Sequence, residues 1–241
     1  MSVAVKSAMV LAAGLGLRLR PITERMPKPL VPIGGKPLLD HALDRLEDAG
    51  VESIVVNAHY KAEMIEQHLA ARRSRAAITL SREDMLLETG GGVLKARPLL
   101  DEVFYVVNSD IFWLDGKTST LARLARAFDP ARHDAVLLLQ RTVTALGYDG
   151  PGDFIADPLG GVRRRGEREV APHLFAGVQV LSRRLFEGCT PGKFSLNPLY
   201  DRAIAAGRLA AIIHDGEWYH IGTPEGLELV EERLATQRTE R

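Results

Sequence analysis

The segment AMVLAAGLGLRLRPITERMPKPLVPIGGKPLLDHALDRLEDAG, residues 8–50, combines an apolar run, a loop rich in glycine and proline, and an amphipathic helical pattern. The apolar run at 8–14 is typical of a strand covered on both faces. The pattern at 37–50 starts with a proline and ends with a glycine, which predicts a capped helix. The apolar face of this helix contains Leu38, Leu39, Ala42, Leu43 and Leu46. A strand followed by a covering helix predicts the first unit of a layered α/β fold.

The same alternation continues through the first half of the chain. Strands are expected at residues 53–59, 77–81, 103–110 and 134–140, and helices at 61–73 and 119–128. Consecutive parallel strands are joined by right-handed crossovers. The expected fold class is therefore α/β, with a doubly wound, mainly parallel, Rossmann-like sheet.

Residues 142–171 interrupt this pattern with glycine, proline and charge. We expect loops and a short hairpin there, laid over the sheet and without a core of their own. Beyond them, strands are expected at 173–182, 209–216 and 217–222, and helices at 195–207 and 223–237. Thr223 is expected to cap the last helix, with Pro224 at its first position. With no repeat or second domain evident, residues 1–241 are expected to form one domain with 142–171 as an insertion.

Composition indicates a globular protein without a large charged surface. Its 241 residues are 46% hydrophobic, which is enough to build a substantial core. The 31 basic and 31 acidic residues balance, so no nucleic-acid partner is expected. The single cysteine, Cys189, excludes an internal disulfide framework and favours a reducing compartment. No apolar run is long enough to span a bilayer. We therefore expect a cytoplasmic protein without a membrane partner, as a monomer or small homo-oligomer.

The glycine loop that follows the first strand differs from both common phosphate loops. Leu19 stands where a dinucleotide fingerprint has its third glycine, and no Gly-Lys-Ser/Thr triplet follows. Glycines after a buried strand still allow backbone N–H groups to approach phosphate oxygens. Arg18 can offer a fork of donors to a triphosphate, and Lys28 a compact charge. The loop, stiffened by prolines, is therefore expected to bind phosphates.

These residues resemble a known family. LAAGLGLRLRPITERMPKPLVPIGGKPLL, residues 11–39, is similar to the signature of the sugar-1-phosphate nucleotidylyltransferases. Further matches are ETGGGVLKA (88–96), VVNSD (106–110), GDF (152–154), AGVQVLS (176–182) and WYHIGTPEGL (218–227). Within the family, residues 86–92 and 194–207 most resemble the N-acetylmuramate-1-phosphate uridylyltransferases of cell-wall recycling, and guanylyltransferases are close relatives. The length resembles the members that consist of the catalytic domain alone, without a hexapeptide-repeat β-helix.

The resemblance implies a reaction in which a sugar 1-phosphate attacks the α-phosphate of a nucleoside triphosphate in line and expels pyrophosphate. Arg18 would hold the β- and γ-phosphates, and Lys28 would neutralise charge near the α-phosphate or the sugar phosphate. Asp110 ends an apolar strand at the carboxyl edge of the sheet, where ligands of such sheets bind, and a carboxylate there can hold Mg²⁺. Asn108 would orient Asp110 or contact the sugar.

His220 departs from the family pattern, because many members carry aspartate at this position. Imidazole suits Mg²⁺ less well than carboxylate does. Three interpretations follow. His220 is a weak metal ligand that favours Mn²⁺ or Co²⁺, or it donates to phosphate, or Asp110 holds the metal with phosphates and waters alone.

The remaining candidates concern the base and the sugar. Backbone groups along the glycine loop and the glycine run are expected at the nucleotide: Ala12, Ala13, Gly14, Gly16 and Gly90. Glu83 either accepts from N3–H of uracil or from N1–H and N2–H of guanine, or is an exposed loop residue. By their positions in the family pattern, Asp153, Gly177 and Thr223 are expected to contact the sugar. The glutamate–lysine pair that many members use is absent, and residues 163–165, three arginines, either compensate or are solvated.

Several functions remain open from the sequence. The first is UTP-dependent formation of UDP-N-acetylmuramate, and the second is a GTP-dependent mannose- or heptose-1-phosphate guanylyltransferase. The third is a nucleotide-sugar-binding regulatory protein that has lost catalysis, with His220 as the sign. Arg18, Lys28 and Asp110 argue against this third hypothesis. Leu19 and the proline-rich loop exclude nicotinamide-dependent redox chemistry.

Overall fold

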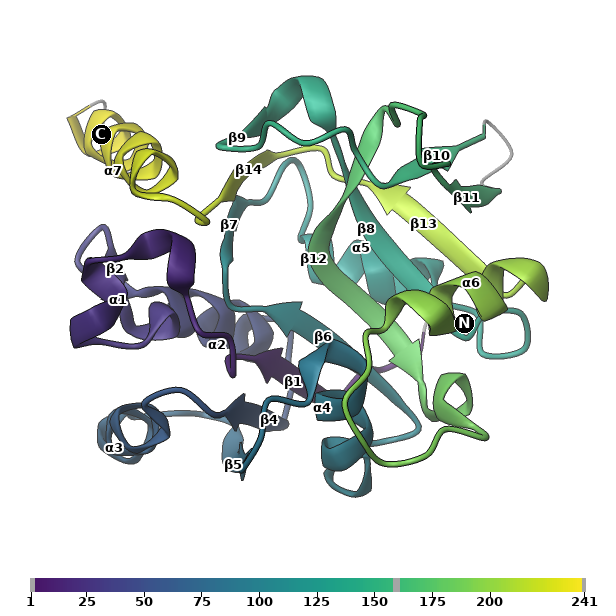
Figure 1. Ribbon diagram of the computed structural model, residues 1–241, viewed down its shortest axis with the longest axis horizontal. Helices are drawn as coiled ribbons and strands as arrows, with labels where there is room; N and C mark the ends of the chain where they lie inside the picture. Colours follow the sequence, from purple (N-terminus) through teal and green to yellow (C-terminus); the bar gives the residue numbers. More distant parts are fainter. Residues whose placement is uncertain (1–2, 158–160, 240–241) are drawn as a thin grey trace.

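The first strand, β1 (Ser7–Leu11), lies inside the parallel part of the sheet. It pairs in parallel with β4 (Ser53–Ala58) on one side and β6 (Val103–Asn108) on the other. β5 (Ala77–Arg82) continues the parallel order beyond β4. The structure is a computed structural model that describes residues 3–157 and 161–239 (Figure 1). These four strands confirm the predicted parallel core.

The other half of the sheet is mixed in direction. The long strand β12 (His173–Ser182) runs antiparallel both to β6 and to β8 (Ala135–Arg141), and β13 (Leu209–Ile213) runs parallel to β8. The alternation of strands and helices did not indicate this reversal, because a buried apolar strand has the same residue pattern whether it runs parallel or antiparallel to its neighbours. The doubly wound architecture holds, with an antiparallel strand beside its parallel core.

The predicted insertion at 142–171 is ordered differently from the expectation. Its hairpin, β10 (Phe154–Ala156) and β11 (Val162–Arg164), does not lie over the sheet but extends it, because β10 pairs with β12 at His173. β12 projects beyond the end of β6, and its backbone groups there require partners. Residues 158–160 of the insertion lie outside the described residues. The short strand β9 (Ala145–Leu146) instead joins β7 (Ile111–Leu114) and β14 (Glu217–His220) in a second small sheet.

Helices cover both faces of the main sheet. α2 (Leu38–Asp48), α3 (Ala62–Ala71) and α5 (Thr120–Ala127) bury apolar residues against one face, and α4 (Glu88–Ala96) and α6 (Asn197–Ala205) against the other (Figure 1). The helices expected at 37–50, 61–73, 119–128 and 195–207 match α2, α3, α5 and α6 to within a few residues, whereas α4 was not predicted. Each face therefore has its own apolar core, as two-layer packing on a sheet requires.

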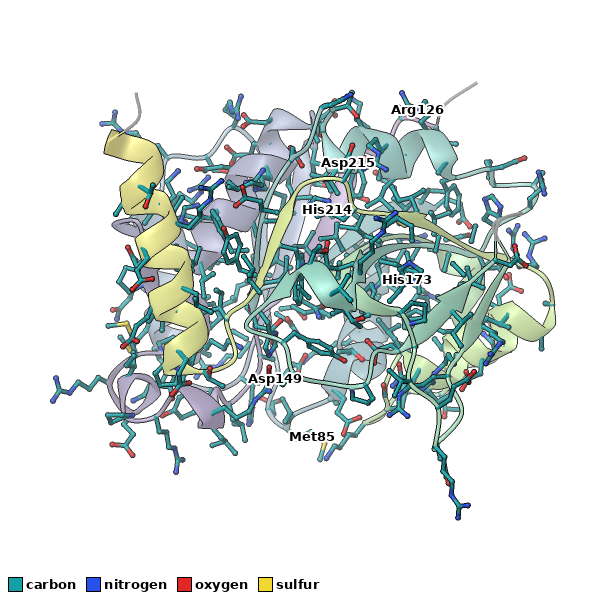
Figure 2. All side chains as sticks on the ribbon, turned by 90° about the horizontal axis from the view of Figure 1, so that it is seen from above. Met85, Arg126, Asp149, His173, His214 and Asp215 are labelled. Atoms are coloured by element: carbon teal, nitrogen blue, oxygen red, sulfur yellow. The ribbon has the colours of Figure 1, made fainter. Side chains whose placement is uncertain are left out.

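A third apolar core links the two ends of the chain. The last helix, α7 (Pro224–Thr239), contributes Val230, which clusters with Leu19 of the glycine loop, Ile33 of β2 (Pro32–Ile33) and Tyr219 of β14. α7 lies beside β2 and runs along one end of the molecule (Figures 1 and 2). Thr223 Oγ1 accepts from the Gly226 N–H at 3.3 Å, which confirms the predicted cap. The remaining short elements are η1 (Leu17–Leu19), α1 (Ile22–Arg25), η2 (Lys28–Leu30), β3 (Lys36–Pro37), η3 (Arg97–Leu99), η4 (Thr142–Thr144) and η5 (Arg183–Phe186).

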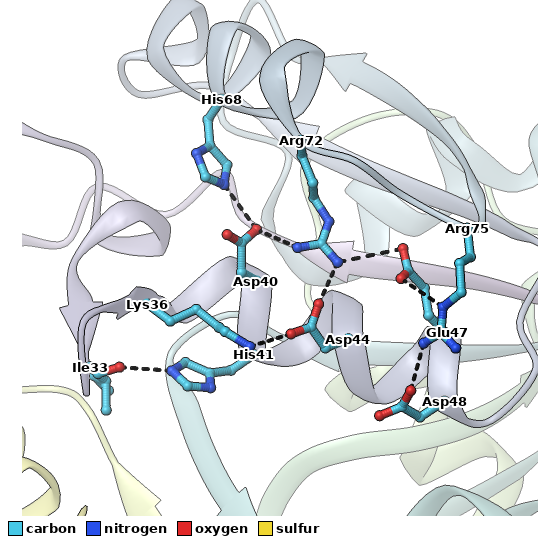
Figure 3. A network of polar contacts seen from close by, with 10 residues as sticks. All are labelled: Ile33, Lys36, Asp40, His41, Asp44, Glu47, Asp48, His68, Arg72 and Arg75. Atoms are coloured by element: carbon cyan, nitrogen blue, oxygen red, sulfur yellow. Dashed lines mark hydrogen bonds and ion pairs between the residues drawn. The ribbon is translucent and has the colours of Figure 1, made fainter.

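A polar network holds α2 against α3 (Figure 3). Arg72, at the C-cap of α3, lies between Asp40 at 3.1 Å and Asp44 at 2.5 Å, both on α2. Burial alone would raise the pKa of Asp44, but Lys36 and Arg72 hold it below its ordinary value. Asp44 is therefore a carboxylate at neutral pH. Within the described residues, no helix is both long and apolar enough to cross a membrane.

Candidate active site

The glycine loop is shaped by one glycine in particular. Gly16 has φ +64°, and a Cβ there would lie 2.9 Å from Cγ2 of Thr23. Thr23 Oγ1 donates to the Gly16 carbonyl at 2.8 Å and fixes the loop from inside. Leu19, three residues on, is fully buried in the third core. Only glycine satisfies both the backbone angle and the space, so the loop reaches the carboxyl end of β1 in one defined conformation.

A cavity of about 600 Å³ lies at the carboxyl ends of β1, β4 and β6. This is the edge where open α/β sheets bind ligands. Seven of the predicted residues line it together: Ala13, Gly14, Gly16, Arg18, Lys28, Asn108 and Asp110. The structure therefore brings the loop, the proline-bracketed lysine and the strand-end aspartate to one place.

Lys28 and Asp110 form an ion pair in the wall of the cavity. The Lys28 ammonium lies 3.2 Å from Asp110 Oδ2, and the two side chains are 10% and 35% exposed. Burial lowers the pKa of Lys28, although the Asp110 carboxylate opposes this. For Asp110, burial acts to raise the pKa, but Lys28, His220 and Arg18 hold it below its ordinary value. Asp110 is therefore a carboxylate at neutral pH.

Arg18 stands at the mouth of the cavity on the exposed turn η1. No hydrogen bond or ion pair joins its side chain to any other residue in the described ranges. A guanidinium without a partner at the edge of a cavity can bind an anionic ligand without first breaking an internal contact. Together with Lys28 it makes the cavity suitable for phosphate groups.

His220 lies beside this ion pair but does not line the main cavity. The Ile221 N–H donates to the Asp110 carbonyl at 3.0 Å and so holds the end of β14 beside the end of β6. The His220 ring stacks on Trp218, with ring centroids 6.1 Å apart. Burial lowers the pKa of His220, and Asp110 only partly offsets this. The imidazole is therefore neutral at pH 7, which is the form that ligates metals.

The side chains around Asp110 could hold a divalent ion together with substrate groups. No group of three or more His, Cys, Asp or Glu side chains suited to a metal occurs in the described part of the chain. Mg²⁺ is commonly held by one or two carboxylates plus substrate phosphates and waters, rather than by an all-protein cage. Asp110, with the neutral His220 at its side, fits that kind of site.

A buried polar chain engages the Ala12 N–H and the Glu83 carboxylate, two of the groups expected at the base. The Ala12 N–H donates to Asn57 Oδ1 at 2.7 Å, and Asn57 Nδ2 donates to Glu83 Oε1 at 2.7 Å. Glu83 Oε2 accepts from the Leu87 N–H at 3.0 Å, and Glu83 is only 3% exposed. The Ala12 N–H and the Glu83 carboxylate are thus already bonded inside the protein. Glu83 is therefore not an exposed loop residue, and it does not line the cavity. It orients Asn57, and Asn57 does line the cavity.

Gly90 also differs from its expected role. Its N–H donates to the Phe194 carbonyl at 2.9 Å, and a Cβ at Gly90 would lie 2.4 Å from the Phe194 ring. A Cβ at Gly91 would lie 2.1 Å from the Gly192 carbonyl oxygen. The glycine run therefore allows segment 192–194 to pack against α4, and the close approach is to protein rather than to a base.

The expected sugar residues separate into different environments. Asn108 lines the main cavity, and Gly177, with φ +78°, packs behind it because a Cβ there would lie 3.2 Å from Asn108 Cβ. Asp153 lines a second, smaller cavity, where Oδ2 accepts from the Phe175 N–H at 2.9 Å. Thr223 lies outside both cavities and caps α7.

Several cavity residues escaped the sequence analysis. They are Leu11, Leu17, Pro29, Asn57, Leu86, Glu88, Thr89, Ser109, Ser195 and Gly222. Asn57 could have been predicted, because it lies near the carboxyl end of β4 in the same way that Asn108 lies at the carboxyl end of β6. Ser195 had none, since it reaches the cavity only through the packing of segment 192–194 on the glycine run. Strand ends can be predicted from sequence, and loop packing cannot.

Comparison with known proteins shows the family of this chain. Residues 7–148 match the protein family described as Nucleotidyl transferase, and this chain belongs to that family. Over 240 residues it is 42% identical to the N-acetylmuramate alpha-1-phosphate uridylyltransferase of Caulobacter vibrioides, covering 98% of this chain and 99% of that one. It is 34% identical over 222 residues to the enzyme of the same description from Neisseria meningitidis, covering 90% and 93%.

The fold is shared with solved structures. The crystal structure of UDP-glucose pyrophosphorylase complexed with UDP-glucose superimposes with a TM-score of 0.81, covering 97% of this chain and 99% of that chain. Sequence identity is 18%, so this similarity concerns the fold alone. It confirms the nucleotidyltransferase type of α/β fold that the sequence predicted.

Proposed function

We propose that this protein converts UTP and N-acetylmuramate 1-phosphate into UDP-N-acetylmuramate and pyrophosphate, as a step of peptidoglycan recycling. The observation that carries the proposal is the 42% identity to the Caulobacter vibrioides uridylyltransferase along nearly the full length of both chains. The Neisseria meningitidis relative of the same description supports it independently.

The reaction needs alignment of two anions and charge compensation more than covalent catalysis. A phosphate oxygen of the sugar 1-phosphate attacks the α-phosphorus of UTP. The bond from that phosphorus to the bridging oxygen breaks, and pyrophosphate leaves with the electron pair. Lys28, in the cavity wall, offsets the repulsion between the two phosphates, and Arg18 at the mouth binds the departing pyrophosphate.

The protein residues also suit a divalent ion, in agreement with a family that typically depends on Mg²⁺. Asp110 would hold it, with His220 as a second donor, and the ion would neutralise phosphate charge in the cavity. Because His220 offers nitrogen rather than oxygen, we propose that Mn²⁺ or Co²⁺ also supports the reaction.

The test is pyrophosphate release from each of UTP, GTP, CTP, ATP and dTTP with the 1-phosphates of N-acetylmuramate, N-acetylglucosamine, glucose and mannose. The grid is run with Mg²⁺, Mn²⁺ or Co²⁺ and after chelation. Turnover of UTP with N-acetylmuramate 1-phosphate above all other pairs is the expected result. Preference for GTP with mannose 1-phosphate would replace the proposal with a guanylyltransferase, and nucleotide binding without turnover under any metal would replace it with a regulatory protein.

A further inference from the structure

Three consecutive arginines at the end of β11 differ in their partners. Arg163 pairs with Glu169 through hydrogen bonds of 2.6 and 2.7 Å, and Arg164 pairs with Asp201 at 3.1 Å. Arg165 has no carboxylate at ion-pair distance within the residues that the structure describes. Its guanidinium bonds at 2.8–3.3 Å to the backbone carbonyls of Gly152, Gly166, Glu167 and Glu169.

These carbonyls hold Arg165 in place without neutralising it. They accept from Nε and Nη1, whereas Nη2 has no hydrogen-bond partner in the described ranges. A planar guanidinium that is already fixed loses little further conformational entropy when it binds a carboxylate. Arg165 is therefore a preorganised cation with unused hydrogen-bonding capacity.

Arg165 lines the second cavity, which has a volume of about 290 Å³. Phe175 and Tyr200 form apolar parts of its wall, and Asp153 and Asn197 supply polar groups. Glu167 and Arg164 also line it, and Arg164 is paired with Asp201. The cavity thus offers one cation without a carboxylate partner, two carboxylates and one amide. Such a set suits a ligand that carries an acid together with hydroxyl or amide groups.

The second cavity opens beside the main one. One edge of β12 pairs with β8. The opposite edge pairs with β6 from Val178 onward and with β10 at His173. These two pairings are five residues apart, across the bulge between Phe175 and Gln179, so they lie closer together than the about 16 Å that a regular strand would span. The end of β6 that carries Asp110 and the start of β10 therefore face each other across one gap. Ser195 lines the main cavity and Asn197, two residues on, lines the second. His173 marks this part of β12 in Figure 2.

We infer that the second cavity receives the 3-O-lactyl group of N-acetylmuramate 1-phosphate, and that Arg165 binds its carboxylate. The inference rests on the proposed function. The lactyl carboxylate is the group that distinguishes N-acetylmuramate from N-acetylglucosamine. With the sugar phosphate at Lys28, the sugar ring lies in the gap along β12 and its lactyl ether points toward the hairpin. The Asp153 carboxylate then accepts from sugar hydroxyl groups.

The experiment compares Arg165→Gln with the wild type on two substrates, N-acetylmuramate 1-phosphate and N-acetylglucosamine 1-phosphate, with UTP. A hydrogen-bonded charge pair corresponds to about a 10- to 100-fold change in equilibrium. The ratio of kcat/KM for the first substrate to that for the second is expected to fall by this factor, mainly through KM. Arg165→Lys keeps the positive charge but loses the paired N–H donors of the guanidinium, so the kcat/KM ratio is expected to fall by a smaller factor. Arg163→Gln, at an arginine that pairs with Glu169, is the matched control and should leave the ratio unchanged.

A second readout is independent of turnover. Dissociation constants of UDP-N-acetylmuramate and UDP-N-acetylglucosamine, measured by calorimetry on the same variants, should show the same loss of discrimination. If Arg165→Gln lowers kcat/KM equally for both substrates, or weakens binding of both products equally, then Arg165 stabilises the hairpin or binds the phosphate that they share. The inference is then wrong, while the proposed function stands. If the wild type does not turn over N-acetylmuramate 1-phosphate with UTP, both are wrong.

Discussion

The ammonium of Lys28 lies 3.2 Å from Oδ2 of Asp110, although 82 positions separate the two residues in the chain. Lys28 stands in a short turn between two prolines, and Asp110 follows the end of β6. The pair places a cation and a carboxylate side by side at the carboxyl edge of the sheet. A phosphate group that entered the cavity would meet both charges.

Asp110→Asn is expected to lower kcat/KM by at least about 100-fold, because the change removes the only negative charge of this pair and with it the preorganised electrostatic site. Thermal unfolding followed by circular dichroism should show a folded protein, since the two side chains have nearly the same shape. Asp48→Asn, at an exposed position on α2, is the control and should retain full activity. Full activity of Asp110→Asn would remove Asp110 from the active site.

Glu83→Gln tests whether this residue is structural or reads the base. The carboxylate accepts from both Asn57 and the Leu87 N–H, so an amide group would place a donor against a donor. The free energy of unfolding, from urea titration, is expected to fall by about 1–3 kcal/mol. The ratio of UTP to GTP turnover should stay constant. A change in this ratio without a loss of stability would restore Glu83 as a base contact, and Glu66→Gln, at an exposed residue, should alter neither.

Gly91→Ala is expected to destabilise the protein by about 1–3 kcal/mol, because the added methyl group would lie 2.1 Å from the Gly192 carbonyl oxygen. Gly166→Ala is the matched control, since the nearest atom there is 3.8 Å away. Thermal unfolding of both variants measures the difference. Equal stability of the two would mean that segment 192–194 does not pack against the glycine run in solution.

Glu217 is expected to contribute stability that depends on pH. Arg233 of α7 donates to Glu217 Oε2 at 2.9 Å, and this contact holds the pKa of Glu217 below its ordinary value of 4.5. A carboxylate with a lowered pKa stabilises the folded state above pH 4.5, and the contribution disappears as the pH falls below 4.5 through the folded-state pKa. At pH 7, Glu217→Gln should therefore cost about 0.5–1 kcal/mol, as expected for a partly exposed pair.

Urea titrations of the wild type and of Glu217→Gln at pH 7, 5 and 3.5 measure this contribution as a difference, so that the other carboxylates cancel. The difference should be constant between pH 7 and pH 5 and should narrow at pH 3.5. A difference that does not depend on pH would show that the contact with Arg233 involves no charge.

Much of the fold and part of the site followed from local patterns in the sequence. The strand at 173–182, the helix face of Leu38 to Leu46 and the Thr223 cap were predicted because periodicity and capping depend on residues a few positions apart. The glycine loop, Lys28 and Asp110 were predicted to meet because the carboxyl ends of parallel strands share one edge.

The tertiary structure alone decided the roles of the residues behind that edge. Glu83 bonds Asn57, Gly90 bonds Phe194, and the hairpin pairs with β12, each across a long separation in sequence. The sequence determined which residues have the chemistry to bind phosphate, because side-chain chemistry is a local property. Which of them have unused hydrogen-bonding groups depends on packing, since Arg163, Arg164 and Arg165 are alike in sequence and differ only in the partners that the fold brings to them.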